Sequence, residues 1–218
     1  MNPVQILMMN QQKSKVGELG LLYNMYAVLD SRNIAPAGCH IPTWEEINTL
    51  ITYIGGFKVG GGKLKEVGAI HWDSPNTGAT DEYLFTGVGN GQRSSEDGTF
   101  VEIKQSGIHW STTLYWQTYY RTLLLRYNSR EINDVVGCDK HSGCAIRCIC
   151  DTNDTIITDI DGNVYDVITI GTQKWLSKNL KVKKYRNGDS IINVTDNTLW
   201  IGLEIGAWCY YDNNPDNF

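Results

Sequence analysis

A long stretch rich in glycine and turn-forming residues limits what this chain can fold into. Between residues 60 and 98 the chain carries a glycine triplet, a turn cluster and a spaced glycine series: Gly60-Gly61-Gly62, Ser74-Pro75-Asn76-Thr77-Gly78, and Gly87, Gly89 and Gly91. Residues of these kinds at this density do not sustain regular helices or strands throughout. We therefore expect this stretch to form loops folded onto a sheet.

One helix is clearly predicted just before that stretch, over residues 43–54. Thr43 is a candidate N-cap, and Glu46 stands three residues later, which makes a capping box. Apolar residues then recur at helical spacing, at Ile47, Leu50, Ile51 and Ile54. Gly55-Gly56 is the expected end of the helix.

The remaining segments read mainly as strands and turns. Strand candidates in the first part of the chain are residues 20–28, 99–104, 119–127 and 142–151. Further along, Asp161-Gly162 predicts a hairpin turn between residues 157–160 and 164–170. Additional turns are expected at Gly171-Thr172 and Asn187-Gly188, and a helical turn at residues 198–203. The predicted fold class is α+β, mostly antiparallel β with one main helix.

Composition and charge exclude several classes of function. The chain has 218 residues, of which 41% are hydrophobic and 20% charged, so it can bury a core. The net charge of −5 argues against a nucleic-acid partner, and the one basic run, residues 178–186, fits a solvated strand face better. No apolar run is long enough to span a bilayer, so we expect no membrane insertion. Residues 1–16 read as an N-terminal arm without the features of a secretory signal.

Candidate metal and catalytic residues are present, but their spacing favours structural roles. The six cysteines are Cys39, Cys138, Cys144, Cys148, Cys150 and Cys209, and the spacing Cys144-x3-Cys148-x-Cys150 follows no common zinc pattern. The histidines are scattered at positions 40, 71, 109 and 141. A calcium loop is suggested by Asp159-x-Asp161-Gly162-Asn163, but a hairpin turn explains it without an ion. We expect no catalytic residues, no metal and no cofactor.

Recognition residues are concentrated between positions 114 and 133. Tyrosine, tryptophan, asparagine, serine and arginine dominate there, and these types combine rigid contact area with adaptable hydrogen bonding. An ordinary β-hairpin with half of its aromatic residues in the core is the alternative, and alternation along the strand does not decide between the two. The candidate ligand-binding residues are Tyr115, Trp116, Tyr119, Tyr127, Asn128, Arg130 and Asn133.

Several motifs together resemble a known family. In the first part they are the segments at residues 21–28, 36–42, 109–113 and 146–151, which read LLYNMYAV, PAGCHIP, HWSTT and IRCICD. In the second part they are residues 159–165, 170–175 and 179–181, which read DIDGNVY, IGTQKW and NLK. This set resembles the Fibrobacter succinogenes major paralogous domain, a family of surface and phage-associated proteins. The resemblance implies a C-type-lectin-like fold, which is also used by formylglycine-generating enzymes and by variable proteins of diversity-generating retroelements.

The order of these motifs differs from the family order. Residues 17–151 resemble the C-terminal part of the family domain, and residues 152–218 resemble its N-terminal part. The chain is then either a circular permutant, whose two parts pack on each other, or a piece of a tandem array. In the second case residues 152–218 would complete a neighbouring chain, which would produce head-to-tail self-association.

The family resemblance also implies a disulfide that this sequence alters. The usual cysteine before the Pro-Ala-Gly motif is Ala35 here, and the tryptophan position within that motif is Cys39. Cys148 has therefore lost its expected partner, unless Cys39 or Cys209 substitutes. These changes predict a protein that does not depend on a disulfide.

Taken together, the residues favour a non-enzymatic recognition or adhesion module. Its expected partner is a glycan or protein on a surface, and its expected location is a virion or cell surface reached by a route that the sequence does not show. The first alternative is a structural virion or fibre component that assembles through residues 152–218. The second is a formylglycine-generating-like copper oxidase that uses Cys148 or Cys150; buried structural cysteines are favoured over it.

Overall fold

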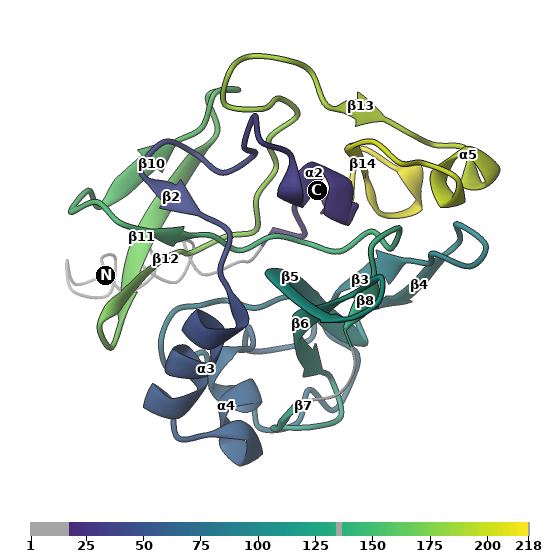
Figure 1. Cartoon of the computed structure of the whole chain (residues 1–218). Coiled ribbons are helices and arrows are strands. Elements are labelled where there is room, and N and C mark those ends of the chain that lie inside the picture. The colour runs from purple at the N-terminus through teal and green to yellow at the C-terminus, as the bar shows by residue number, and fades with distance from the viewer. Residues whose placement is uncertain (1–17, 134–136, 218) are drawn as a thin grey trace, which may run out of the picture.

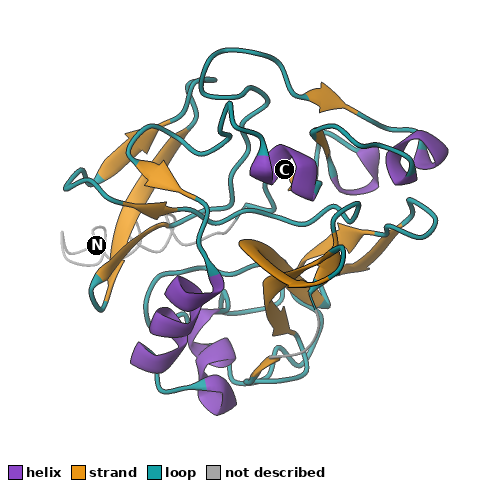
Figure 2. Cartoon of the chain, in the orientation of Figure 1, coloured by secondary structure: helices purple, strands orange, loops and turns teal. Residues whose placement is uncertain are grey.

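The computed structural model describes residues 18–133 and 137–217, so the predicted arm at residues 1–16 lies outside the described part. Three small sheets and a group of helices are joined by long loops (Figures 1 and 2). Most strand pairs are antiparallel; β3–β5 and β13–β14 are parallel. The chain is therefore mostly β with a smaller helical share, as the sequence predicts.

The largest sheet carries the segment that was predicted to bind a ligand. Its centre is the hairpin of β5 (Ser106–Trp116) and β6 (Tyr119–Arg126), and its order is β4-β3-β5-β6-β7 with β8 also paired to β6. The other strands are β3 (Asn90–Arg93), β4 (Phe100–Ile103), β7 (Ile132–Asn133) and β8 (Cys138–Asp139). The strands expected at residues 99–104 and 119–127 are confirmed. The longest strand, β5, was anticipated only as a motif.

The second sheet combines strands from both parts of the chain. Its order is β10-β11-β12-β9-β2, where β9 (Ile149–Cys150) and β2 (Cys39–His40) come from the first part. The others are β10 (Ile156–Thr158), β11 (Val164–Ile170) and β12 (Gln173–Leu176). The two predicted turns at Asp161-Gly162 and Gly171-Thr172 join β10 to β11 and β11 to β12, so both are confirmed.

The third sheet also joins the two parts. Strand β14 (Ala207–Cys209) lies between β1 (Leu22–Tyr23) and β13 (Ile192–Asn193). Helix α5 (Asn197–Ile201) fulfils the expected helical turn at residues 198–203, and a 3-10 turn, η1 (Tyr211–Asn213), follows β14. Hydrogen bonds from Tyr23 Oη to the Val182 carbonyl (2.7 Å) and from Asn24 Nδ2 to the Ile205 carbonyl (2.9 Å) add to this joint.

Helix α3 (Trp44–Tyr53) is the main helix and forms as predicted. The Thr43 side chain accepts from the backbone N–H of Glu46, and the Glu46 carboxylate accepts from the backbone N–H of Thr43, which completes the capping box. Ile47, Leu50 and Ile51 face the core.

A second helix, α4 (Phe57–Leu64), contradicts the prediction that the glycine triplet opens a loop region. Its glycines are required by close packing rather than by flexibility. A Cβ on Gly61 would lie 2.4 Å from the Glu131 carbonyl oxygen, and one on Gly62 would lie 2.2 Å from the Gly78 carbonyl oxygen. The helix thus lies directly against the backbone of neighbouring loops, and only glycine permits that approach.

Two predicted strands are shorter than expected. Within residues 20–28 only β1 is extended, because Asn24 caps a short helix, α2 (Met25–Leu29), by accepting from the Ala27 N–H. Within residues 142–151 only β9 is a regular strand. The rest pairs through single bridges with three different segments, at Tyr23, Arg93 and His109, so no continuous ladder forms.

Two buried arginines of the first part of the chain, Arg93 and Arg147, form hydrogen bonds with residues of the second part. Arg147 donates to the Asn179 side chain (2.8 and 3.0 Å) and to the Leu176 carbonyl, and Arg93 donates to the Val194 and Thr195 carbonyls. Burial lowers the pKa of both guanidinium groups, that of Arg147 to about 9. Backbone carbonyls and the Asn179 amide thus accept hydrogen bonds from these two guanidinium groups. Within residues 18–133 and 137–217, no helix has the length and apolar character needed to cross a lipid bilayer.

Candidate functional site

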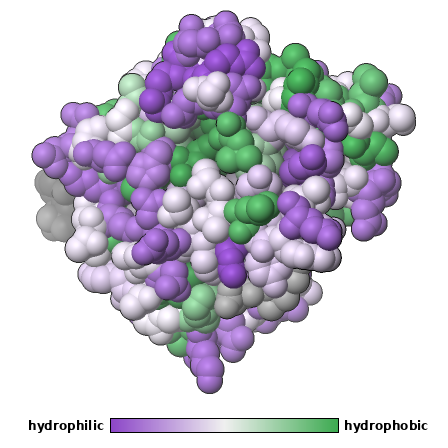
Figure 3. Space-filling view, in the orientation of Figure 1, coloured by the Kyte–Doolittle hydropathy of each residue, from purple (hydrophilic) through white to green (hydrophobic). Residues whose placement is uncertain are grey.

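The tip of the β5–β6 hairpin exposes a group of large apolar side chains. Leu114 is 53% exposed, Tyr115 51% and Trp116 63%, although the first half of β5 is buried. Trp116 pairs directly with Tyr119 across the turn. On the face drawn in Figure 3, hydrophobic residues form small separate groups among hydrophilic ones, which is usual for a protein surface. Three adjacent large apolar residues on one hairpin tip are therefore notable.

The Arg121 side chain lies near two aromatic rings beside this tip, those of Tyr115 and Trp44. The Arg121 guanidinium carbon is 5.0 Å from the centre of the Tyr115 ring and 5.0 Å from that of Trp44. Trp44 is the first residue of α3, and its backbone N–H donates to Thr113 Oγ1 at 2.9 Å. The tip aromatics are thus continuous with the start of α3. Trp44 and Arg121 were not among the predicted site residues. Arg121 lies on β6 itself, whereas only the tertiary fold brings Trp44 to the hairpin.

The turn of the hairpin is held by neighbouring residues. Thr118 Oγ1 donates to Asp139 Oδ2 at 2.5 Å, and the Lys140 N–H donates to the Thr118 carbonyl at 2.8 Å. Strand β8 pairs with Tyr119 and Tyr120. The tip therefore presents its rings from a braced strand pair, which limits the entropy lost on binding.

The structure does not bring the seven predicted ligand-binding residues together. Tyr115, Trp116 and Tyr119 lie at the hairpin tip, whereas Tyr127, Asn128 and Arg130 follow the other end of β6. Eight strand residues separate these ends by roughly 25 Å. Asn133 lies on β7 and pairs with Leu124 of β6, away from the tip.

The group around Tyr127 has a structural function. The buried Lys65 ammonium donates to the carbonyls of Thr77, Arg126 and Ser129, each at 2.9 Å. The Tyr127 carbonyl accepts from the Thr77 N–H, and the Arg130 carbonyl accepts from the Gly62 N–H. These bonds fix the loop around Lys65 and α4, so this end of β6 supports the fold.

The structure corrects the expectation about disulfides. Cys39 and Cys150 are bonded to each other and lie directly opposite on β2 and β9. Cys148 is a separate, fully buried thiol whose pKa burial raises to about 12. A reactive cysteine needs an accessible thiolate, and neither Cys148 nor Cys150 offers one in this state.

Two histidines have contrasting settings. His40 joins two carboxylates, with Nδ1 2.9 Å from Asp151 Oδ2 and Nε2 2.8 Å from Glu46 Oε1. Burial lowers the pKa of His40, but the hydrogen bonds to these carboxylates outweigh it, so the pKa is raised overall. His109 is buried beside Arg147, and burial together with that positive charge lowers its pKa to about 3.

The segment that resembles a calcium loop is closed by its own hydrogen bonds. Asp159 Oδ1 accepts from the backbone N–H groups of Asp161 (3.0 Å) and Asn163 (2.9 Å). Asp159 Oδ2 accepts from the Tyr165 hydroxyl at 2.8 Å. The Asp161 carboxylate accepts from the Lys183 N–H and pairs with Lys184. These carboxylates stabilise the β10–β11 turn.

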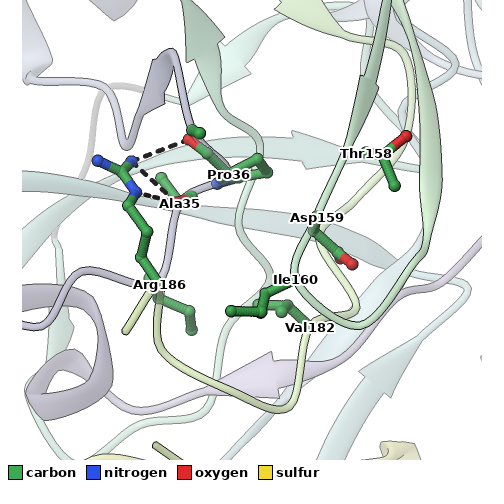
Figure 4. A pocket seen from close by; sticks show the side chains of 9 residues that line it. Ala35, Pro36, Thr158, Asp159, Ile160, Val182 and Arg186 are labelled. Carbon is green, nitrogen blue, oxygen red and sulfur yellow. Dashed lines mark hydrogen bonds between the residues drawn. The ribbon is translucent and has the colours of Figure 1, made fainter. Parts of the chain in front are cut away.

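A small hollow of about 200 Å³ lies where residues 34–37 meet the β10–β11 turn (Figure 4). Ile160 and Val182 give it an apolar wall, and Arg186 lies at its edge. The Arg186 guanidinium donates to the carbonyls of Ala35 (2.9 Å) and Pro36 (2.8 Å), as the dashed lines in Figure 4 show. The Arg186 guanidinium therefore joins two segments of the chain, and the hollow lies at this joint.

Comparison with known proteins identifies the family. A family model described as the Fibrobacter succinogenes major domain matches residues 2–150, which is more than half of the chain. No curated protein and no solved structure matches this sequence. Residues 151–218 lie outside the family match, so the predicted origin of that part in a permuted or tandem order stays a prediction. On the strength of the match over residues 2–150, the chain belongs to the Fibrobacter succinogenes major domain family.

Proposed function

We propose that this protein is a non-enzymatic recognition module of a bacterial surface or phage particle. It binds a glycan or protein on its target through the β5–β6 hairpin tip. The observation that carries this proposal is the exposure of Tyr115 and Trp116 on a braced hairpin, next to the Tyr115–Arg121–Trp44 stack. Large rings and arginine are the residue types that dominate binding energy in recognition surfaces.

A C-type-lectin-like fold is part of the proposal. It is supported by the small sheets, the long loops and the main helix, which packs against β5 and β6 of the largest sheet. The proposal does not use the Asp159–Asn163 turn as a calcium site, because the Asp159 carboxylate already accepts hydrogen bonds from the turn backbone and from Tyr165.

The disulfide supports a location outside the reducing cytosol. Disulfides persist in oxidising compartments and are rare where cellular thiols keep cysteines reduced. The Cys39–Cys150 bond joins two short strands at the edge of the second sheet. A surface or virion location, reached by a route that the sequence does not show, agrees with this bond.

The test removes two rings of the tip together, the exposed Trp116 and the half-buried Tyr119 that pairs with it. We expect the Trp116→Ala/Tyr119→Ala double variant to lose at least tenfold in affinity for target cells or virions, because both rings lie at the tip. The matched control is Leu199→Ala/Ile205→Ala, which removes two exposed apolar side chains elsewhere, 65% and 57% exposed. Circular dichroism and thermal melting check that both variants fold. Unchanged binding by the folded tip variant would refute the proposed site.

Assembly is the alternative function, and one observation favours it. The β1–β14 and β9–β12 pairs join residues on either side of the exposed connection at 151–155. The same pairs could form between chains if this connection opened, and would then link subunits head to tail. Light scattering during size-exclusion chromatography tests this: an open polymer that grows with concentration would favour assembly, and a constant mass near 24.5 kDa would exclude it. Copper-dependent oxidation, the remaining alternative, would require the buried Cys148 or the disulfide-bonded Cys150 to become accessible.

A further inference from the structure

Two hollows meet beside α3, and none of the residues that line them belongs to the hairpin tip. The first, of about 440 Å³, lies between the outer face of α3 and the β11–β12 turn. The second, of about 300 Å³, lies between Glu46, the end of β9 and the start of β12. Both are lined by Thr172 in the turn, so they form one groove, which we call the α3 groove. Figure 1 shows the β11–β12 hairpin extending toward α3.

The walls of the α3 groove are fixed to each other. A Cβ on Gly171, whose φ is 62°, would lie 2.8 Å from the Tyr53 ring, so the turn rests directly on that ring. Gln173 Nε2 donates to the Glu46 carbonyl at 2.9 Å, which ties β12 to the first turn of α3. The groove is therefore preformed, and a ligand would not have to order it.

One wall of the groove is a polar stripe along the helix. The residues at positions i, i+3, i+4, i+7 and i+8 of α3 share its outer face and line the groove: Glu45, Asn48, Thr49, Thr52 and Tyr53. The Thr49 and Thr52 hydroxyls donate to helix carbonyls at 3.1 and 2.8 Å, which leaves their oxygens as acceptors.

The remaining side chains of the stripe can act on a ligand. The side chains of Glu45 and Asn48 have no hydrogen-bond partner among the residues that the structure describes. The stripe ends at the Tyr53 ring, which is 58% exposed and meets the Tyr83 ring edge-on at 5.9 Å. Acceptors, an amide donor and an exposed ring together match a ligand that carries many hydroxyl groups and an apolar ring face.

The charge of the α3 groove further restricts the class of ligand that it can bind. Three carboxylates line it, those of Glu45, Glu46 and Asp151, against the single ammonium of Lys174. Lys174 Nζ donates to the Thr152 carbonyl at 2.8 Å, and His40 bridges the carboxylates of Glu46 and Asp151. Glu45 adds a further negative charge, so the groove stays negative on balance. Like charges in a groove exclude anionic partners, so uronic-acid and sulfated sugars are disfavoured.

We infer that the α3 groove binds a neutral oligosaccharide. This inference rests on the proposed recognition function and names its ligand class. The stripe from Glu45 to Tyr53 begins next to Trp44, which stacks on the hairpin-tip arginine. A sugar chain along α3, whose ten residues span about 15 Å, thus extends from the Tyr53 ring toward the hairpin tip.

The test follows backbone and side-chain amide signals of the ¹⁵N-labelled full chain by NMR. The probes are hexasaccharides of glucose, mannose and N-acetylglucosamine, with hexagalacturonate as the acidic counterpart. We expect at least one neutral probe to shift the signals of Asn48, Thr52 and Thr172, and hexagalacturonate to leave them in place. The Asn48→Ala/Thr52→Ala variant should bind that probe at least tenfold more weakly. The matched control, Thr198→Ala on the exposed face of α5, should bind it as the parent does.

The outcomes separate this inference from the proposed function. Neutral probes that shift only hairpin-tip signals would overturn the groove and leave the tip as the binding site. No shift with any neutral probe would also overturn the groove, whereas target binding that still depends on Trp116 and Tyr119 would leave the recognition function standing. If a neutral probe shifts the groove signals and the Trp116→Ala/Tyr119→Ala variant still binds the target as the parent does, the groove is supported and the tip is refuted as the binding site.

Discussion

At the scale of single residues, His109 makes the free energy of unfolding depend on pH. The Asn179 side-chain oxygen accepts hydrogen bonds from Arg147. The same oxygen lies 3.0 Å from His109 Nε2, so Nε2 carries the proton of a neutral imidazole and donates it to this oxygen. The pKa of His109 is about 3 in the folded chain, against 6.5 for an ordinary histidine. Between these values the unfolded chain binds a proton that the folded chain does not, so the free energy of unfolding falls as pH falls.

The expected loss from this residue is roughly 1.4 kcal/mol for each pH unit below about 6. In His109→Gln the amide can still donate to Asn179 but cannot take up the proton. We expect this variant to lose less stability than the parent between pH 6.5 and pH 4. Urea unfolding at several pH values measures the two slopes, and equal slopes would show that His109 does not set the acid response.

At the scale of elements, α4 shows that packing can outweigh helix propensity. Alanine normally stabilises a helix interior by about 1 kcal/mol relative to glycine. At Gly61, however, a Cβ would meet the Glu131 carbonyl oxygen at 2.4 Å and its carbon at 2.8 Å. We therefore expect Gly61→Ala to destabilise the protein by about 1–3 kcal/mol.

Gly202→Ala is the control for that change, since the nearest atoms to its added Cβ lie 3.8 and 4.0 Å away and its φ is −95°. It should change the free energy of unfolding by less than about 0.5 kcal/mol. Thermal or urea unfolding compares the two variants. A stabilised Gly61→Ala protein would mean that α4 can move away from the 130–131 backbone.

The elements that sequence predicts here are those specified by nearby residues. The capping box of α3 and the turn residues at Asp161-Gly162 act within a few positions, so both were found. Helix α4 was missed because its glycines are required by contacts outside the local sequence, with Gly78 for Gly62 and with Glu131 for Gly61. The candidate site divides in the same way: Tyr115, Trp116 and Tyr119 are close through a local turn, whereas the contribution of Trp44 depends on packing between α3 and the hairpin.

At the scale of the whole molecule, contacts between the two parts of the chain occur in two of the three sheets described and in the core. Strand pairs, buried arginines and the groove walls all join residues 18–151 to residues 152–217. The sequence suggested such complementarity through its family motifs, but it did not specify which strands pair. Pairing between distant strands depends on the complete fold, because no local residue pattern encodes it.

The Cys39–Cys150 disulfide closes a covalent loop over 111 positions of sequence. Cross-linking residues that far apart removes entropy from the unfolded chain, which corresponds to about 3–5 kcal/mol of stability. We expect Cys39→Ser/Cys150→Ser to lower the free energy of unfolding by about that amount, measured by urea unfolding. Reduction should destabilise the parent similarly and leave the variant unchanged. Cys138→Ser, at a half-buried free thiol, is the control and should retain the response to reduction. A parent chain that unfolds identically with and without reductant would mean that non-covalent pairing of β2 with β9 already supplies the stability of this edge.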